Sequence, residues 1–309
     1  MNILKALIVS MRPTQWLKNL SLFAAIFFWG QLLEAEILFK VGEAFLAFSL
    51  LSSSVYLFND IIDRKRDQRH PFKKERPIAK GTLPLPIAAA AFAIFAAGSL
   101  IWIALRFNQF FFNLALAFFI LQLLYSLVFR NLIILDALIV AFAFILRVYA
   151  GAFIIPTPIS SWLTLSVIGL ALLLAFGKRR SERTLLSSLH QKLLTRITLR
   201  EYPDTLLDSM ISMAAAFTII TYSLFAFQTS PTTEATFLAG LIPSTMATPR
   251  WMMLTIPIVI YGVARYLYVI YEKKEGESPE KVLLSDLPLL STVFLWIAAV
   301  FLIIYSLGS

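Results

Sequence analysis

The stretch Asn59-Asp60-Ile61-Ile62-Asp63-Arg64-Lys65-Arg66-Asp67 places three carboxylates and one amide at the end of a long apolar segment. Positions three and four apart in a helix share a face, so Asp60, Asp63 and Asp67 are predicted to line up over two turns, with Asn59 one turn before Asp63. Carboxylates this close repel one another unless cations lie beside them. Magnesium prefers oxygen ligands and often shares them with phosphates, so the spacing predicts a Mg²⁺ site for a diphosphate, with Mn²⁺ as an alternative ion.

A plainer interpretation is that these acids form a solvated helix end, paired with basic neighbours such as Arg64 and Arg69. The composition around them favours a ligand-binding site instead. A long apolar run precedes the acids, and residues 69–77, which follow them, are rich in Lys, Arg and Pro. A solvated helix end does not need that combination.

The composition predicts an integral membrane protein. Hydrophobic residues make up 59% of the chain and charged residues 15%, whereas about a quarter of residues are charged in soluble proteins. About 17 to 25 apolar residues can span a bilayer as a helix, and the apolar runs do not alternate as β-barrel strands would. We therefore expect an all-α membrane protein with nine spans, of which the first is least secure because Asn19 and Gln31 interrupt it. The expected spans are residues 16–33, 42–62, 84–105, 108–128, 132–154, 160–177, 207–229, 250–271 and 287–307.

The positive charges predict the orientation. Lys and Arg stay on the cytoplasmic side of short loops, and most of the 27 such residues fall near the amino terminus and in the polar loops 63–83, 178–206 and 272–286. We expect the amino terminus in the cytoplasm, the carboxyl terminus outside, and the active site on the cytoplasmic face of the cell (inner) membrane. The net charge of +9 then reflects topology and attraction for anionic lipids or phosphorylated substrates, not nucleic acid. No linker divides the chain, so residues 1–309 are read as one transmembrane domain.

Several kinds of site are excluded or unsupported. The chain has no cysteine, which excludes disulfides, thiolate metal sites and a cysteine nucleophile. His70 and His190 are isolated, and no Walker loop or G-x-G-x-x-G stretch occurs. The chemistry is therefore expected from carboxylates and cations near the inside loops.

The second inside loop offers two further candidates. Lys178, Arg179 and Arg180 directly follow a span, where cations bind phosphate about as often as they simply anchor the helix at the inside face. Asp204 and Asp208 stand four apart where the seventh span begins. They form either a second acidic pair or first-turn acids that favour the helix dipole, and the latter is preferred.

Two arginines are predicted inside spans, where ionisable residues are expensive and often functional. Arg265 lies about two turns, or roughly 10 Å, from the inside end of the eighth span, deep enough to reach a phosphate in a cavity open to the cytoplasm, although it could also snorkel to the interface. Arg147 lies nearer the outside end of the fifth span, where it can easily snorkel outward, so it is the weaker candidate of the two. Asp136 shares its helix face about three turns earlier.

The amino-terminal end of the chain, up to the start of the first span, carries another group of polar residues. In Met11-Arg12-Pro13-Thr14-Gln15-Trp16-Leu17-Lys18-Asn19, the side chains of Arg12, Gln15 and Asn19 fall at helical spacing with Lys18 beside them. The alternative is a routine basic and aromatic flank to a span, with Trp16 at the interface.

With these residues in view, the chain resembles the UbiA-type intramembrane prenyltransferase superfamily, whose first acidic motif reads N-D-x-x-D-x-x-x-D and is matched by Asn59, Asp60, Asp63 and Asp67. More narrowly, it is similar to the decaprenyl-phosphate phosphoribosyltransferase branch of that superfamily. The matching stretches, which run in order across most of the chain, are Arg12-Pro13-Thr14-Gln15-Trp16-Leu17-Lys18-Asn19, Arg76-Pro77-Ile78-Ala79-Lys80-Gly81, Tyr125-Ser126 and Gly177-Lys178-Arg179.

The superfamily resemblance implies nine helices around a central cavity open to the cytoplasm, a lateral opening for an isoprenoid tail, and Mg²⁺ held by the acidic motif. The branch resemblance implies that polyprenyl phosphate attacks the anomeric carbon of 5-phosphoribosyl diphosphate at the bilayer and releases diphosphate. It implies catalytic roles for Lys18 and the three acids, and metal binding by these acids and Asn59. The implied substrate-binding residues are Arg12, Gln15, Asn19, Lys73, Arg76, Lys80, Tyr125, Lys178, Arg179, Glu182 and Arg265.

Two other functions stay open. Aromatic-acceptor members carry a second strong acidic motif after the sixth span, where this chain has Lys178-Arg179-Arg180 and only Glu182. Because Asp204 and Asp208 could imitate that motif, a polyprenyl diphosphate transferase acting on 4-hydroxybenzoate or a related aromatic acid is the alternative. A lipid transporter is the third hypothesis, although no internal repeat is evident and the polar groups gather at one face. Whether the chain forms a homo-oligomer is also open.

Overall fold

The computed structural model describes residues 2–69, 73–188, 202–230, 250–273 and 279–306. Every regular element in these segments is a helix, which confirms the expected all-α class. The chain divides into two compact units. Unit 1 comprises Met1–Ile26, Gln31–Pro158 and Leu186–Tyr202, and unit 2 comprises Phe27–Gly30, Ile159–Leu185 and Pro203–Ser309.

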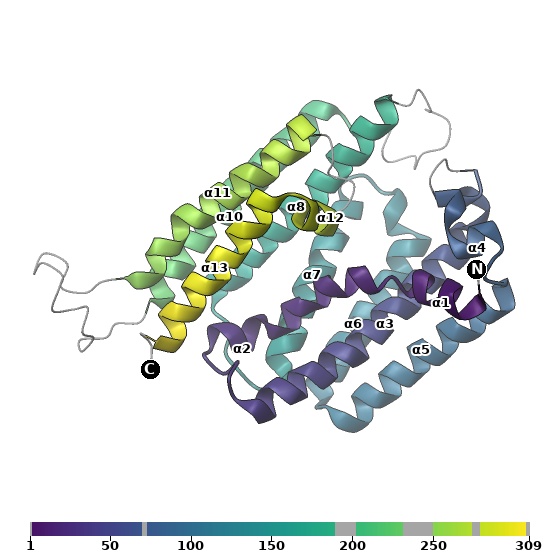
Figure 1. Cartoon of the computed structure of the whole chain (residues 1–309), viewed down its shortest axis with the longest axis horizontal. Helices are drawn as coiled ribbons and strands as arrows, with labels where there is room; N and C mark the ends of the chain where they lie inside the picture. Colours follow the sequence, from purple (N-terminus) through teal and green to yellow (C-terminus); the bar gives the residue numbers. More distant parts are fainter. Residues whose placement is uncertain (1, 70–72, 189–201, 231–249, 274–278, 307–309) are drawn as a thin grey trace, which may run out of the picture. The chain divides into compact units, whose positions relative to one another are not determined.

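Unit 1 is built around the long helix α3, along which α5 packs (Figure 1). Short 3₁₀ segments connect several of its α-helices. In chain order its elements are α1 (Ile3–Met11), η1 (Pro13–Phe23), α3 (Ala35–Asp67), η2 (Lys73–Glu75), α4 (Pro77–Lys80), α5 (Leu85–Arg106), α6 (Gln109–Leu127), η3 (Phe129–Asn131) and α7 (Leu135–Ile154). Helix α2 (Ala24–Phe28) lies where the chain passes from unit 1 to unit 2.

Unit 2 contains the remaining long helices, in which glycines allow close packing. A Cβ atom on Gly169 of α8 would lie 2.7 Å from the Thr218 hydroxyl of α10, and one on Gly177 would lie 2.7 Å from the Tyr266 hydroxyl of α11. The elements of unit 2 are α8 (Ser161–Ser188), α10 (Asp204–Thr229), η6 (Trp251–Thr255), α11 (Ile256–Tyr268), the π-helix η7 (Val269–Lys273), α12 (Pro279–Ser285) and α13 (Leu287–Ser306).

Eight helices of the described segments are long and apolar enough to cross a membrane. They correspond to eight of the nine expected spans and make the chain a multi-pass membrane protein. The expected span at 16–33 differs, because it consists of the 3₁₀-helix η1, the short α2 and a break at Gly30, whose φ is 77°. At about 2 Å per residue, a 3₁₀-helix is longer and thinner than an α-helix of equal length.

The 3₁₀ geometry of η1 has a visible packing reason. With three residues per turn, positions three apart eclipse one another, and Trp16, Asn19 and Leu22 form one line along η1. Asn19 and Leu22 are buried, and the Trp16 indole donates to the Ser53 hydroxyl of α3 at 3.0 Å. Leu22 approaches α7 so closely that a Cβ on Gly151 would lie 2.1 Å from the Leu22 carbonyl oxygen. The thin backbone of η1 therefore fits between α3 and α7.

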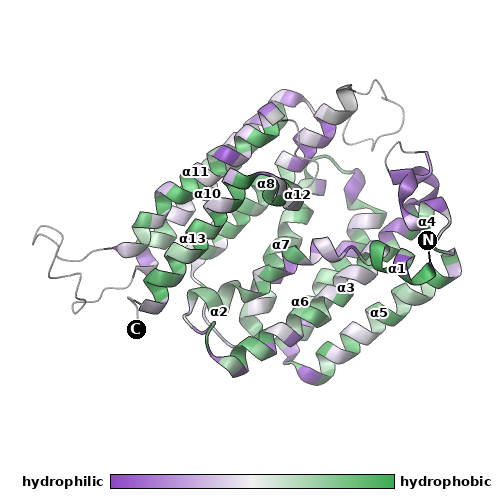
Figure 2. Cartoon of the chain, in the orientation of Figure 1, coloured by the Kyte–Doolittle hydropathy of each residue, from purple (hydrophilic) through white to green (hydrophobic). Residues whose placement is uncertain are grey.

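Helix α3 is longer than a membrane crossing requires. Its 33 residues extend about 50 Å, whereas the hydrocarbon layer is about 30 Å thick. The apolar part of α3 packs in an aromatic core, with the Phe48 ring centroid 4.7 Å from that of Phe118. Hydrophilic residues gather around α4, and hydrophobic ones predominate along α5 (Figure 2). The end of unit 1 near α4 is therefore its polar end, and there the acids of α3 are buried.

Candidate active site

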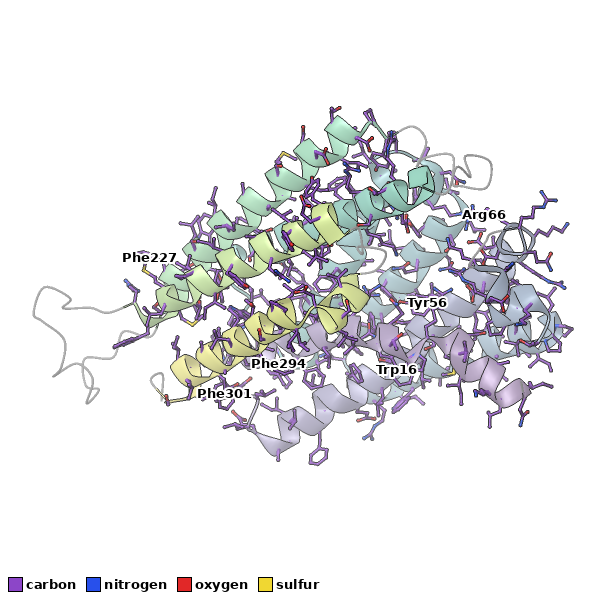
Figure 3. All side chains as sticks on the ribbon, turned by 45° about the horizontal axis from the view of Figure 1, so that its top comes forward. Trp16, Tyr56, Arg66, Phe227, Phe294 and Phe301 are labelled. Carbon is purple, nitrogen blue, oxygen red and sulfur yellow. The ribbon has the colours of Figure 1, made fainter. Side chains whose placement is uncertain are left out.

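The acids of the opening motif form part of one stripe along α3. Ser53, Tyr56, Asp60, Asp63 and Asp67 follow one another at spacings of three and four residues, which keeps them on one helix face. The three acids are 2%, 7% and 2% exposed. The stripe changes from a hydroxyl through an aromatic ring to carboxylates along α3, and Figure 3 labels Tyr56 within it. Buried carboxylates need compensating charges or hydrogen bonds.

Two arginines supply compensation for the first and third acids. Arg12, in the left-handed conformation between α1 and η1, pairs with Asp60. Arg76 Nη1 lies 3.1 Å from Asp60 Oδ1 and 2.7 Å from Asp67 Oδ2, so one guanidinium bridges two carboxylates. Both arginine side chains are 27% exposed, so they are the solvent-accessible partners of acids that are almost fully buried.

The Arg76 bridge depends on a tightly folded local segment. Pro77 begins α4, which fits its missing N–H, and Gly81 ends α4 at a φ of 82°, a left-handed conformation that glycine adopts readily. Ile78 is buried in a cluster with Leu57 of α3. The stretch Arg76-Pro77-Ile78-Ala79-Lys80-Gly81 therefore acts as an anchored turn that directs the Arg76 side chain towards the acids.

The middle acid has its own pair of arginines. Arg66 Nη2 lies 3.0 Å from one carboxylate oxygen of Asp63, and Arg130 Nη1 lies 2.5 Å from the other. Arg130 was missed as a candidate, because in the sequence it stands alone and serves only as a topology signal. Its position 67 residues from Asp63 left no local pattern to detect. It sits on η3, and after η3 the chain turns sharply through Ile134, whose φ is 68°.

Asn59 and Tyr125 are brought to the α3–α6 contact. The Asn59 side-chain oxygen accepts a hydrogen bond from Ser126 of α6, and Tyr125 is the neighbouring residue, half-buried. Lys73 is also half-buried in η2. Lys80 is exposed and donates to Glu75 at 2.6 Å, which holds the pKa of that carboxyl below its usual value.

The donor set suits a hard cation, but the carboxylates are held by guanidinium groups. Carboxylate oxygens on one helix face are the ligands that Mg²⁺ prefers. Among the described residues, no three His, Cys, Asp or Glu side chains form a group that could hold a metal. Asp60, Asp63 and Asp67 are spread along two turns, and each pairs with at least one arginine. Metal binding by these acids therefore requires the arginines to exchange partners.

The amino-terminal candidates are arranged by a period of three, which corrects the expected α-helical spacing. Arg12 precedes η1, and Gln15 and Lys18 follow it at intervals of three, with Lys18 Nζ donating to Gln15 Oε1 at 2.6 Å. Asn19 lies on the neighbouring line and is buried, with its amide nitrogen 3.0 Å from the Ser49 hydroxyl. Asn19 therefore faces the packed interior of unit 1.

Arg147 does not snorkel outward, although its place in the sequence would allow it. Its side chain is buried, and its Nε donates to the Asn19 side-chain oxygen at 2.9 Å. Asp136, which the spacing placed on the same face, accepts instead from the Tyr202 hydroxyl at 2.7 Å. That hydroxyl in turn accepts from the Ile134 amide at 2.6 Å.

Unit 2 gathers the candidates of the second inside loop into ion pairs. Arg179 is buried and donates to Glu182 at 2.6 Å, while Lys178 is half-buried. The two acids at the start of α10 face arginines of α8. The distances are 2.8 Å from Arg180 Nε to Asp208 and 2.7 Å from Arg183 Nε to Asp204.

Arg265 makes a two-pronged contact within unit 2. Its Nε and Nη2 donate to the two carboxylate oxygens of Asp286 at 3.0 and 2.9 Å. Asp286 is 2% exposed and also accepts from the Leu289 amide at the start of α13 at 3.0 Å. Asp286 was not predicted as a partner, and it binds the guanidinium that was expected to reach a phosphate.

Known proteins resemble this chain along nearly its whole length. The model of the UbiA prenyltransferase family matches residues 20–179. The decaprenyl-phosphate phosphoribosyltransferase of Mycolicibacterium smegmatis is 31% identical across 98% of this chain and 94% of its own. The Mycobacterium tuberculosis protein of the same name is 29% identical, with 97% and 94% covered.

Solved structures support the fold independently. A UbiA homologue from Archaeoglobus fulgidus, bound to GPP and Mg²⁺, superposes with a TM-score of 0.69 at 22% identity and covers 97% of this chain and 99% of its own. A digeranylgeranylglyceryl phosphate synthase structure gives a TM-score of 0.63 at 14% identity, covering 99% of this chain and 100% of its own. From the family match and the full-length relatives together, the chain belongs to the UbiA prenyltransferase family.

Proposed function

We propose that this protein transfers the 5-phosphoribosyl group from phosphoribosyl diphosphate to a polyprenyl phosphate. The observation that carries the proposal is the near full-length match to relatives named decaprenyl-phosphate phosphoribosyltransferase. In the reaction, an oxygen of the lipid phosphate bonds to the anomeric carbon of ribose. The bond from that carbon to the diphosphate oxygen breaks, and its electron pair leaves with the diphosphate.

The ion-paired acids of unit 1 fit this chemistry. The lipid phosphate is already an anion, so the reaction needs no strong general base, and neutralising the leaving diphosphate is the larger task. We assign Asp60, Asp63 and Asp67, with Asn59, as ligands for Mg²⁺, with Mn²⁺ as a substitute. The bound ion would neutralise charge on the diphosphate.

The cations around the acids would bind the phosphates themselves. Arg12 and Arg76 are partly exposed and adjacent to Asp60, so they are placed to take diphosphate oxygens. Gln15 and Lys18 continue the line of Arg12 along η1. A planar guanidinium offers paired N–H donors that match phosphate oxygens. The remaining candidates for substrate binding are Lys73, Lys80, Tyr125, Lys178, Arg179 and Glu182, whereas Arg265, whose guanidinium binds Asp286, is assigned a structural role.

We further propose that the two units form one domain of nine helices around a cavity open to the cytoplasm, in the cell (inner) membrane. The length of α3 supports an acid-bearing end outside the hydrocarbon layer, and the inside loops carry most of the Lys and Arg. The ninth crossing would be η1 with α2, which together extend about 30 Å, close to the hydrocarbon thickness.

The test offers purified protein two substrate pairs with Mg²⁺. One pair is polyprenyl phosphate with phosphoribosyl diphosphate, and the other is polyprenyl diphosphate with 4-hydroxybenzoate. We expect a polyprenyl-phospho-phosphoribose by mass spectrometry from the first pair only, and none from Asp60→Asn, Asp63→Asn or Asp67→Asn or in the presence of a chelator. A product from the second pair alone would establish the aromatic-acceptor reaction. Release of no diphosphate from either pair would favour a transporter.

A further inference from the structure

Arg147 is a buried cation that the proposed reaction does not yet use. It lies in α7, within a membrane-crossing helix, and is 6% exposed. Its guanidinium carbon lies 4.6 Å from the Phe118 ring centroid, and its Nη1 donates to the Ala143 carbonyl at 3.3 Å. Within the described part of the chain, no carboxylate forms an ion pair with Arg147. A charge held in a span without such a partner is costly, and such residues are usually retained for function.

Among the residues that the structure describes, Asn19 of η1 is the one whose side chain hydrogen-bonds Arg147. Arg147 is only a donor, so Asn19 presents its oxygen to Nε, at 2.9 Å. The Asn19 amide nitrogen is then left to donate to Ser49 and Ser52 of α3, at 3.0 and 3.4 Å. Asn19 is thus clamped between α7 on one side and α3 on the other.

A second contact one turn farther along fixes the same pair of elements. Gly151 lies four residues after Arg147, and Leu22 lies three residues after Asn19. The absence of a Cβ on Gly151 lets the Leu22 carbonyl touch α7. Two contacts, Arg147 with Asn19 and Gly151 with Leu22, therefore fix the rotation of η1 about its own axis relative to α7.

The rotation of η1 decides where its other polar line faces. Gln15, Lys18 and Ser21 are spaced by three and eclipse one another in a 3₁₀-helix. They are linked by bonds of 2.6 Å from Lys18 to Gln15 and 2.8 Å from Ser21 to the Lys18 carbonyl. Arg12, which directly precedes this line, forms an ion pair with Asp60. A 3₁₀-helix has weak hydrogen-bond geometry of its own, so its orientation depends on such side contacts.

We propose that Arg147 is a positioning residue that acts through Asn19. It holds η1 at the rotation that keeps Gln15 and Lys18 in line with Arg12 beside the acids of α3. The inference rests on the proposed function for its kinetic test, since Gln15 and Lys18 are assigned there to substrate. Its structural test is independent of substrate.

The kinetic test compares Arg147→Met with Arg147→Lys. Met keeps much of the side-chain volume without the charge or donors, whereas Lys can still donate to Asn19. We expect Arg147→Met to raise KM for phosphoribosyl diphosphate about tenfold or more, since displacing a binding group by about 1 Å can cost a factor of about 10². Arg147→Lys should recover part of this loss. The matched control is Ile103→Ala on α5. Ile103 is buried in the hydrophobic cluster that contains Phe118, the ring contacted by Arg147, so its truncation should lower the melting temperature without raising KM.

A double variant shows whether Arg147 acts through η1. If Lys18 is the group that Arg147 positions, Arg147→Met added to Lys18→Gln should cost little beyond Lys18→Gln alone. Losses that multiply independently would overturn the proposal. A fall in melting temperature with a wild-type KM in Arg147→Met would also overturn it.

The structural test uses the absence of native cysteines. Ser21→Cys introduces a single thiol on the line of Lys18, and its rate of labelling by a membrane-permeant maleimide reports the exposure of that line. We expect Arg147→Met to change this rate about threefold or more, as a rotated half-buried residue gains or loses solvent access, and Ile103→Ala to leave it unchanged. An unchanged rate in Arg147→Met would sink the proposal. If the wild type shows no phosphoribosyl transfer but the labelling rate changes in Arg147→Met, the proposed function is wrong, whereas the positioning of η1 by Arg147 is supported.

Discussion

At the scale of single residues, the three acids of α3 form ion pairs with arginines, and these pairs must open before the acids can bind a metal ion. Arg76 bridges Asp60 and Asp67, and its side chain is far more exposed than either carboxylate. A divalent cation on these acids would compete with the Arg76 guanidinium, whereas a diphosphate would attract it. The same residue therefore opposes binding of the metal alone and favours binding of the anion.

This competition predicts opposite effects of Arg76→Gln. Without diphosphate, the variant should bind Mn²⁺ more tightly, by roughly tenfold or about 1.4 kcal/mol, measured by the electron paramagnetic resonance signal of free Mn²⁺. With Mn²⁺ saturating, it should bind inorganic diphosphate more weakly. Arg106→Gln, which alters an exposed arginine at the far end of α5, should change neither affinity. Weaker binding of both ligands by Arg76→Gln would show that Arg76 is not a competing counter-charge.

A second residue-scale prediction separates the two roles of Arg265. Its two-pronged contact with Asp286 supplies a counter-charge to a buried carboxylate, and removing that counter-charge destabilises a fold. We expect Arg265→Gln and Asp286→Asn to lower the melting temperature of the purified protein while KM for both substrates stays near the wild-type value. A raised KM at an unchanged melting temperature would instead support phosphate binding by Arg265.

At the scale of elements, regular α-helical periodicity was predictable and long-range pairing was not. The shared face of Asp60 and Asp67 follows from spacing within one helix. Arg12 reaches Asp60 from 48 residues away and Arg130 reaches Asp63 from 67 residues away, and nothing in their local sequence indicates these contacts. The 3₁₀ form of η1 was also missed, although Trp16, Asn19 and Leu22, each with a side chain suited to packing, recur with a period of three.

The close approach of η1 to α7 gives a prediction about glycine. A Cβ at position 151 would collide with the Leu22 carbonyl oxygen, whereas a Cβ at Gly98 meets no atom within 4 Å. Gly151→Ala should therefore destabilise the protein by about 1–3 kcal/mol or more, as overpacking does, and should weaken substrate binding by displacing η1. Gly98→Ala in the middle of α5 should be neutral or stabilising by up to about 1 kcal/mol. Thermal unfolding of the two variants in detergent measures the contrast, and equal stabilities would contradict the packing of η1 against α7.

At the scale of the whole molecule, composition was sufficient to predict an all-α membrane protein but not to predict the structure of every membrane-crossing segment. Eight apolar helices follow directly from hydropathy. The segment near residues 16–33 does not, because it serves two purposes. Its polar line supplies candidate substrate ligands, and its packed line is buried in unit 1, so it lacks the continuous apolar surface by which a span is recognised.

The whole-molecule prediction concerns which substrate carries the diphosphate. If the sugar donor supplies it, phosphoribosyl diphosphate with Mg²⁺ should bind without lipid and raise the melting temperature of the detergent-solubilised protein. A ligand that binds only the folded state stabilises it by about 2.7 kcal/mol at a hundredfold excess over Kd. 4-Hydroxybenzoate should give no shift, and Asp60→Asn, which removes one charge from the acid stripe, should lose the shift given by the sugar diphosphate. A melting temperature that ignores saturating phosphoribosyl diphosphate but rises with a polyprenyl diphosphate would mean that the acids hold the lipid's diphosphate, as the aromatic-acceptor reaction requires.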